Sequence, residues 1–525
     1  MRVAAENSFG KWLVLFLVVC LWLPCAAALA GSTRAATRNA IGAQLTIGML
    51  DPVPALLSGS QVTTNVNTLA TKGRAVQGAG ADGVTQIVIR FAASAAGQAY
   101  TITLLNDQGQ QSTSVVNDGG LGPIGTTSFT QSQIVVTGVS TSQGPMAFAI
   151  YQSPIDFPRL SGHDAGSTTR MVSLQVQANG GGDAGEQAVT LLRPMVFLVH
   201  GLWGAPSDFD EFTPFITDPR WISERANYSQ HIGSELTGYT PAYPAEDVPS
   251  IRKLATAASL GYSFNAPGVL NQASNAISQF KNGTNPAQIP VASVQADFVC
   301  HSMGGLVTRW FVELSSYLSD ATFAQGVVHK VVTIGSPHLG SPLATDLLQN
   351  DNSCTRNLNS LLGNVTFATA SHNSETTTGA VNDLQGDGFG GSLSAALQQL
   401  QNPSPHPFPF ALIQGLASQS QFNAVNNSLN AEIIRATCAG NPLADDLTGS
   451  GWPTVFQQAS DTIVPALSAT NGNFTATIVN GVVHSDGAIT LGFGPPAELD
   501  AAGGIPVVVE TLLNTNLTSS TYVYF

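Results

Sequence analysis

The chain has 525 residues, of which 43% are hydrophobic and 10% are charged, and its formal net charge is −14. This length and apolar content argue against a disordered chain and predict two or more domains with large buried cores. Lys and Arg number 19 against 33 Asp and Glu. The clustered cations that nucleic acids and anionic lipid surfaces attract are therefore scarce, and we expect neither as a partner.

Residues 1–30 are predicted to be a secretory signal peptide. Arg2 and Lys11 flank a polar start, Trp12–Leu23 is an uninterrupted apolar run, and Ala28-Leu29-Ala30 matches the small-residue pattern of a cleavage site. An uncleaved membrane anchor is the alternative, because the apolar segment is nearly long enough to span a bilayer. We therefore expect a secreted, periplasmic or cell-surface protein.

Three of the five cysteines would remain after removal of this segment. Cys300 follows apolar residues and is predicted to be a small core residue. Cys354 and Cys438 could form a disulfide in an exported protein, or could be two free thiols.

Residues 41–190 are predicted to form an all-β sandwich. Short runs with period-two alternation are separated by Gly, Asn, Asp and Ser, and no long helical pattern interrupts them. The main runs are Thr85–Phe91, Tyr100–Leu104, Ser132–Thr137, Met146–Tyr151 and Met171–Val176. The run Ala81-Asp82-Gly83-Val84-Thr85 resembles immunoglobulin-like modules of bacterial surface proteins. This resemblance implies a module that positions or binds. No catalytic constellation is apparent in its residues.

Residues 191–525 are predicted to form an α/β domain, and Gly180–Gly185 indicates a turn or linker before it. Apolar strands at Arg193–Val199, Val294–Val299 and Val327–Ile334 alternate with helical segments such as Val269–Lys281. This alternation is typical of a mostly parallel sheet with helices on both faces.

Residues from about 343 to 450 break this rhythm and are rich in Asn, Gln, Ser and Gly. We interpret them as an insertion that forms a cap or lid. A surface subdomain with no gating role is the alternative.

The segment around Ser302 carries the clearest chemical signal. The strand Val294–Val299 is followed by a sharp turn, His301–Gly305, and by a predicted helix, Leu306–Leu314. Such a strand–turn–helix presents one hydroxyl at the edge of a parallel sheet, beside the N-terminus of a helix. Ser302 is the predicted nucleophile, although Cys300 stands where Gly is favoured in such turns.

Two later residues supply the partners that a nucleophilic serine needs. Asp461 follows a short apolar segment, and His484 lies on a loop late in the chain. His484 is the predicted general base, and Asp461 is predicted to fix its tautomer and stabilise the imidazolium. The competing acids are Asp445, Asp446 and Asp486.

A glycine-containing loop, His200–Gly204, directly follows the strand Arg193–Val199. Its position predicts that the backbone N–H groups of Leu202 and Met303 form an oxyanion hole. The histidines His200, His301 and His338 are interpreted as structural. No sequence pattern for a metal or phosphate ligand is apparent.

Together these motifs resemble the α/β-hydrolase superfamily, in particular its bacterial-type lipase and esterase branch. The matching motifs are His-Gly-Leu-x-Gly at residue 200, His-Ser-Met-Gly-Gly at residue 301, Pro-His-x-Gly-Ser at residue 337 and Asp-x-x-Val-Pro at residue 461. The resemblance implies hydrolysis of acyl esters through an acyl-serine intermediate, without a cofactor.

We therefore expect an exported serine hydrolase that acts on small-molecule or lipid esters. One alternative is a surface adhesion or binding protein whose hydrolase-like domain is inactive. Another is an acyltransferase or amidase with the same triad, because one acyl-serine intermediate serves all these reactions. The sequence indicates no oligomeric state.

Overall fold

The computed structural model describes residues 44–202, 204–228, 261–349, 380–388, 390–402, 404, 406–421, 459–472, 474–484 and 496–524. The predicted signal peptide, Cys354, Cys438, the three competing acids and much of the predicted insertion lie outside these ranges. Within them, none of the helices has both the length and the apolarity to cross a bilayer.

The first described residues form a sheet of antiparallel strands with the order β10-β11-β6-β1-β4, in which β8 also pairs with β11. Its strands are β1 (Gly48–Asp51), β4 (Arg74–Ala75), β6 (Gln86–Ala92), β8 (Gly120–Gly122), β10 (Val139–Thr141) and β11 (Gly144–Gln152).

A second sheet has the order β16-β5-β13-β12-β7-β9. Its strands are β5 (Gly78–Gly80), β7 (Ala99–Leu105), β9 (Gln133–Thr137), β12 (Thr169–Ala178), β13 (Ala184–Leu192) and β16 (Val291–Ala292). In β12, buried residues alternate with more exposed ones, as expected of a strand with one covered face. The five main predicted β runs lie within two residues of β6, β7, β9, β11 and β12, and a sixth, predicted at Gln61–Thr63, corresponds to β3 (Gln61–Val62).

These two sheets share one core. Ile87 and Ile89 of the first sheet belong to the same buried cluster as Ile102, Leu174 and Val176 of the second. The region is therefore built from two packed sheets, and its kinship with immunoglobulin-like modules stays a prediction. Its smaller elements are η1 (Pro54–Leu56), β2 (Leu57–Ser58), β3 (Gln61–Val62), α1 (Val66–Thr71) and α2 (Val115–Asp118).

Gly180, Gly181 and Gly182 all have positive φ and form the hairpin turn between β12 and β13. Of the two readings of this segment, turn or linker, the structure has the turn, and it lies inside a sheet. The predicted division at residue 190 is crossed by β16, which comes from the later part of the chain and pairs in parallel with β5 of the second sheet. A two-residue strand carries too little periodicity to be predicted.

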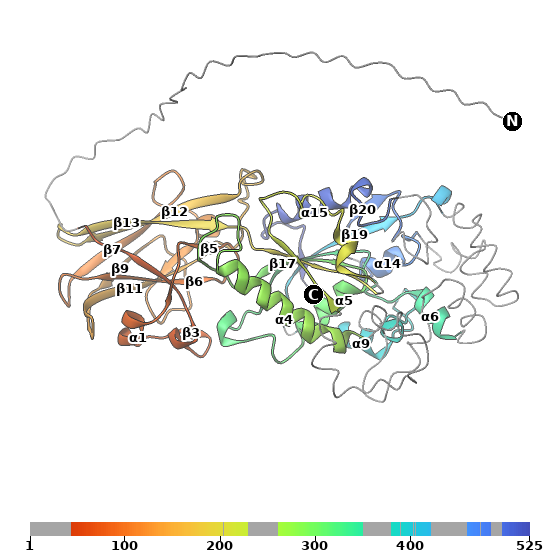
Figure 1. The fold of residues 1–525 in the computed structure, drawn as a ribbon, viewed down its shortest axis with the longest axis horizontal. Coiled ribbons are helices and arrows are strands. Elements are labelled where there is room, and N and C mark those ends of the chain that lie inside the picture. The colour runs from red at the N-terminus through yellow and green to blue at the C-terminus, as the bar shows by residue number, and fades with distance from the viewer. Residues whose placement is uncertain are drawn as a thin grey trace, which may run out of the picture. The chain divides into compact units, whose positions relative to one another are not determined.

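A third, mostly parallel sheet carries the later residues, with the order β15-β14-β17-β18-β19-β20 (Figure 1). Its parallel strands are β14 (Val196–Val199), β15 (Ser223–Arg225), β17 (Ala296–His301), β18 (Val328–Ile334), β19 (Pro409–Leu416) and β20 (Ala476–Asn480). A short strand, β21 (Val523–Tyr524), pairs antiparallel with β19.

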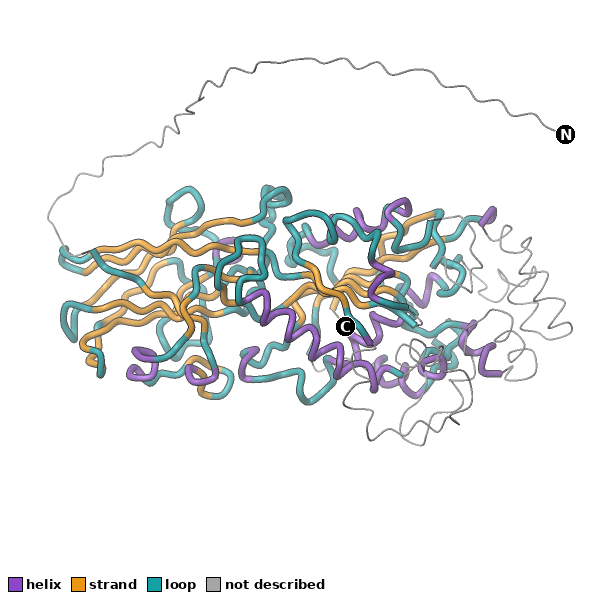
Figure 2. Tube along the Cα trace, viewed as in Figure 1, coloured by secondary structure: helices purple, strands orange, loops and turns teal. Residues whose placement is uncertain are grey.

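Every residue of β14, β17 and β18 is buried, because helices cover both faces of this sheet. Phe197 and Val199 point into a cluster with residues of α4 (Tyr262–Lys281) and α5 (Met303–Phe311), whereas Val196 and Leu198 pack with α15 (Ile505–Leu513). Figure 2 shows helices concentrated around this sheet.

The remaining described helices are α6 (Pro342–Gln349), α8 (Ala380–Asp383), α9 (Ala395–Leu400) and α14 (Ala466–Ala469), with 3-10 turns η2 (Pro206–Phe209), η5 (Asp320–Thr322) and η7 (Ala501–Gly503). The helix predicted from Val269 begins instead at Tyr262. Pro267 lies inside α4 and lacks the N–H that a helical hydrogen bond needs. The sequence therefore predicted that the helix begins after this proline.

The predicted insertion is also too long. Pro409–Leu416 falls inside the segment 343–450, yet it forms β19 and pairs with β18 and β20 in the third sheet. The prolines that precede this strand indicated a loop, because Pro interrupts regular hydrogen bonding. Any insertion is therefore divided by a strand of the sheet itself.

Candidate active site

Ser302 occupies a strained turn between β17 and α5. It is the N-cap residue of α5, with φ 55° and ψ −131°, a conformation that non-glycine residues rarely adopt. Such strain costs on the order of 1–3 kcal/mol and persists only where the surroundings enforce it. The backbone N–H of Ser302 donates to the carbonyl of Ile334 at 2.9 Å, which ties the turn to the end of β18.

The two glycines after Ser302 let α5 approach the sheet. A Cβ added to Gly304 would lie 2.3 Å from the carbonyl oxygen of Val199, and one added to Gly305 would lie 2.4 Å from Ser336 Oγ. Before the serine, Cys300 stands where the sequence pattern favours Gly. Its thiol is fully buried, and Sγ lies 3.2 Å from Thr308 Oγ1. Burial raises the pKa of this thiol to about 12, so Cys300 fills the core as an uncharged residue.

The structure brings Ser302, His484 and Asp461 into one hydrogen-bonded chain. Ser302 Oγ lies 2.8 Å from His484 Nε2, and His484 Nδ1 lies 2.9 Å from Asp461 Oδ2. With the ring proton at Nδ1, the hydroxyl donates to Nε2 and Nδ1–H donates to the carboxylate. The geometry is that of a nucleophile, a base and an orienting acid.

Asp461 is held as an acceptor by the backbone around it. Its Oδ1 accepts from the N–H of Ile463 at 2.9 Å and of Val464 at 2.7 Å. Its carbonyl accepts from the N–H of His484 at 2.8 Å, which joins the two loops. Asp461 is fully buried, so the carboxylate is shielded from water and its charge acts strongly on the imidazole.

The loop predicted to supply an oxyanion donor lies against the serine. A Cβ on Gly201 would lie 2.5 Å from Ser302 Cβ and 2.9 Å from Oγ, so the backbone that leads to Leu202 passes next to the hydroxyl. Met303 is the first residue of α5, where N–H groups have no intrahelical partner. Both predicted donors therefore come from segments that flank Ser302.

The histidines interpreted as structural are buried and neutral. Burial lowers the pKa of His200 to about 4, and the hydroxyl of Tyr228 donates to the His200 carbonyl at 2.6 Å. Burial also holds the pKa of His301 and of His338 well below the ordinary value. His301 Nε2 lies 3.2 Å from the carbonyl oxygen of His484, so its role is to support the loop that carries His484.

Glu498 is a residue that sequence reasoning missed. Its carboxyl is fully buried, and Oε2 lies 3.4 Å from His484 Nδ1. The available signal was a single acid between Ala497 and Leu499, because a charged residue among apolar ones must find a buried partner.

Among the described residues, His301, His484 and Glu498 form the group whose ligand atoms, all within 4.8 Å of one another, could converge on a metal ion. Hydrogen bonding already accounts for the cluster. Both ring nitrogens of His484 are engaged, one with Ser302 and one with Asp461.

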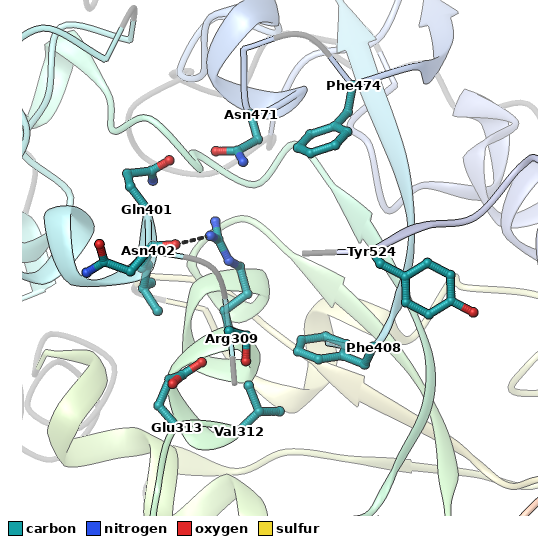
Figure 3. Close-up of a pocket in the computed structure, with 11 residues that line it drawn as sticks. Arg309, Val312, Glu313, Gln401, Asn402, Phe408, Asn471, Phe474 and Tyr524 are labelled. Carbon is teal, nitrogen blue, oxygen red and sulfur yellow. Dashed lines mark hydrogen bonds between the residues drawn. The ribbon is translucent and has the colours of Figure 1, made fainter. Parts of the chain in front are cut away.

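A separate cavity of about 240 Å³ lies beside the C-terminal end of α5 (Figure 3). Phe408 and Phe474 precede the amino ends of β19 and β20, whereas Ser302 follows the carboxyl end of β17. The lining residues of this cavity do not include Ser302, His484 or Asp461. Its walls include Arg309, Gln401, Asn402, Phe408, Phe474 and Tyr524.

Residues 273–386 match the model of a family described as Domain of unknown function (DUF7379). The match includes Ser302 but spans far less than half of the chain. No curated protein sequence matches the chain. Among solved structures, the chain is similar to α/β-hydrolases and lipases over about 60% of its length or slightly more.

Three such structures illustrate the likeness. A lipase of Bacillus licheniformis in its mature form is 15% identical, with a TM-score of 0.33, over 61% of this chain and 91% of that chain. An extracellular α/β-hydrolase from a Paenibacillus species is 9% identical, with a TM-score of 0.27, over 62% and 100%. A lipase in an open form is 9% identical, with a TM-score of 0.26, over 69% and 99%. At these values the likenesses carry no argument about activity.

Proposed function

We propose that this protein is a serine hydrolase that cleaves carboxylic esters through an acyl-serine intermediate. The observation that carries the proposal is the continuous chain from Ser302 Oγ to His484 Nε2 and from His484 Nδ1 to Asp461 Oδ2, at 2.8 Å and 2.9 Å. The positive φ of Ser302 supports it further, because strain at a single polar residue in a buried turn is typical of a functional site.

In the first half-reaction, Ser302 Oγ attacks the carbonyl carbon of the ester while its proton passes to His484 Nε2. The tetrahedral intermediate places a negative oxygen near the N–H groups of Leu202 and Met303, and each such donor contributes on the order of 3 kcal/mol of barrier lowering. The intermediate then collapses, the alkoxide takes the proton from His484, and the alcohol leaves.

In the second half-reaction, water attacks the acyl-Ser302 carbonyl and gives a proton to His484 Nε2. The bond to Oγ breaks, the proton returns to Ser302, and the carboxylic acid is released. The Asp461 carboxylate stabilises the imidazolium that forms in both steps. The chemistry needs only the side chains and backbone groups on this one sheet edge.

The test combines covalent labelling with turnover. A fluorophosphonate reacts only with an activated serine, so we expect it to label the wild type and not the Ser302→Ala variant. Turnover of p-nitrophenyl esters should fall by on the order of 10⁶-fold in the same variant. Ser128→Ala, at an exposed serine, is the matched control and should behave as the wild type. Absence of labelling in the wild type, or turnover retained by Ser302→Ala, contradicts the proposal.

The acyl specificity is tested by a chain-length series of the same esters, with and without an oil–water interface. We propose that lipid or other acyl esters are the substrates. If the protein is labelled at Ser302 but hydrolyses none of these esters, the proposed reaction becomes amide cleavage or acyl transfer.

A further inference from the structure

A second carboxyl group, that of Glu498, lies beside the acid end of the proposed triad. Glu498 Oε2 is 3.4 Å from His484 Nδ1, compared with 2.9 Å for Asp461 Oδ2. Two carboxyl groups therefore approach the same ring nitrogen, although the imidazole has one proton there to donate. The mechanism above uses only Asp461, which leaves the role of Glu498 unexplained.

The backbone places Glu498 next to His484. Val483 donates its N–H to the carbonyl of Pro496 at 3.1 Å, and Glu498 donates its N–H to the carbonyl of Val483 at 2.8 Å. This pairing fixes Glu498 alongside the residue before His484. The position of the carboxyl is thus set by the same short segment that positions the base.

Two glycines make room for the carboxyl. A Cβ on Gly335, at the end of β18, would lie 2.2 Å from Glu498 Oε2 and 2.9 Å from Asp461 Oδ2. A Cβ on Gly415, in β19, would lie 2.3 Å from Glu498 Oε1, and the Gly415 N–H donates to that oxygen at 3.0 Å. The carboxyl therefore has a fitted site that opens toward Asp461.

The hydrogen bonds indicate where a proton lies. Oε1 accepts from Gly415, but among the described residues no group donates to Oε2. His484 Nδ1 faces Asp461. His301 Nε2 lies 3.2 Å from Glu498 Oε2 and also 3.2 Å from the His484 carbonyl, which accepts its hydrogen bond. A buried carboxylate oxygen without a donor is costly, whereas a carboxylic acid O–H at that position donates to Asp461.

The charges around Glu498 favour the same state. The titratable groups that face it are Asp461, His484 and His301. Burial raises the pKa of Glu498 well above the ordinary value, and the negative charge of Asp461 raises it further. His301 supplies no compensating charge, because burial keeps it neutral. Two neighbouring carboxylates cannot both stay ionised in a buried site.

We propose that Glu498 is a positioning residue that stays a carboxylic acid and donates a hydrogen bond from Oε2 to Asp461 Oδ2. This inference rests on the proposed function, because it concerns how strongly Asp461 stabilises the imidazolium of His484. The pair beside His484 then carries one negative charge, partly withdrawn from Asp461 by the hydrogen bond. Glu498 thereby tunes the pH dependence of the proposed reaction.

The experiment compares Glu498→Gln with Glu498→Met. The amide of Gln accepts from Gly415 and donates to Asp461. The kcat/KM of this variant should therefore stay within tenfold of the wild type, and its pH profile should not shift. Met fills the site but donates nothing, so Asp461 keeps its full charge and stabilises the protonated imidazole. The acidic limb of the kcat/KM profile should then move up by about one pH unit. Glu186→Gln, at an exposed glutamate of β13, is the matched control.

Two outcomes overturn the inference. A loss of more than about tenfold in Glu498→Gln means that an ionised carboxylate is required, because the amide N–H would oppose His484 Nδ1–H. An acidic limb in Glu498→Met that stays or moves down means that Glu498 only fills space. Fluorophosphonate labelling of wild-type Ser302 is measured in parallel. If this labelling is absent, the proposed function is contradicted, and the result says nothing against the role of Glu498.

An infrared measurement decides the question even if Glu498→Met does not fold. At neutral pH, the difference spectrum between the wild type and Glu498→Gln should contain the carbonyl stretch of a protonated carboxylic acid, with a shift in D₂O. A difference spectrum with only carboxylate bands overturns the inference. This readout requires no substrate and no turnover.

Discussion

A single buried carboxyl, that of Glu498, connects the proposed chemistry to the energetics of folding. In the unfolded chain a glutamate ionises near its ordinary pKa of 4.5, whereas burial and Asp461 raise the pKa of Glu498 well above it in the folded protein. Above pH 4.5, folding must therefore take up a proton at this residue. The site thus costs stability at neutral pH, which is common where residues are arranged for function.

The pH dependence of stability isolates this cost. Between pH 4.5 and the raised pKa, Glu498 binds more protons in the folded state than in the unfolded state, so its contribution to the unfolding free energy falls as pH rises. Glu498→Gln has no such proton. Its unfolding free energy relative to the wild type should rise by about 1.4 kcal/mol for each pH unit in this window. Urea titrations over a pH series measure it, and a pH-independent difference contradicts a neutral Glu498.

At the scale of elements, the junction of β14, β17 and α5 determines where the serine lies. Gly304 allows the first turn of α5 to approach the end of β14 so closely that a Cβ would meet the carbonyls of Val199 and His200 at 2.3 Å and 2.9 Å. Backbone atoms cannot move aside as a flexible side chain can. The helix and the loop before Leu202 are therefore held at one distance, which sets the spacing between Ser302 and the proposed oxyanion donors.

Gly304→Ala should push α5 away from β14. We expect the rate of fluorophosphonate labelling to fall by about 100-fold, because a displacement of about 1 Å misaligns the reacting groups. The unfolding free energy should fall by about 1–3 kcal/mol through overpacking. Gly166→Ala is the matched control, since a Cβ there meets nothing within 4 Å. A labelling rate equal to that of the wild type would show that this close approach is irrelevant to the serine.

The elements around Ser302 were predictable because local signals and tertiary structure agree there. An apolar run, a glycine-containing turn and a helical pattern follow one another over residues 294–314, where β17 and α5 lie, although α5 begins three residues before the predicted helix. The role of Glu498 was not predictable, because the groups that surround its carboxyl, namely Asp461, Gly335 and Gly415, come from distant parts of the sequence. β19 was misassigned for a similar reason, since only its pairing with β18 and β20 reveals a strand after so many prolines.

At the scale of the whole described chain, the two-sheet region and the α/β region share buried polar contacts. Asp82, from the segment that resembles immunoglobulin-like modules, accepts from the N–H groups of Val294 and Gln295 at 3.0 Å each, just before β17. His329 Nε2, in β18, lies 2.9 Å from the carbonyl of Ile155. These contacts tie the amino ends of β17 and β18 to the β-sheet region, so that region supports the strand that carries Ser302.

A further contact between the two regions is a buried ion pair. Lys330 Nζ, in β18, lies 2.8 Å from Asp156 Oδ2, and the two side chains are 0% and 1% exposed. Lys330 also donates to the carbonyl of Leu513 at 3.1 Å, and Asp156 Oδ2 accepts from the N–H of Leu517 at 3.1 Å. Removal of one member leaves the other charge buried and uncompensated, which is far more costly than loss of a surface pair.

Asp156→Ala should therefore lower the unfolding free energy by about 3–5 kcal/mol. Asp210→Ala, which breaks the pair of Arg225 with a largely exposed aspartate, is the matched control and should cost less than about 1 kcal/mol. Because the pair joins the two regions, both should unfold in one transition in urea, with coincident curves from near-ultraviolet and far-ultraviolet circular dichroism. A separate transition of the β-sheet region, unaffected by Asp156→Ala, would mean that this region folds independently and gives β17 no support.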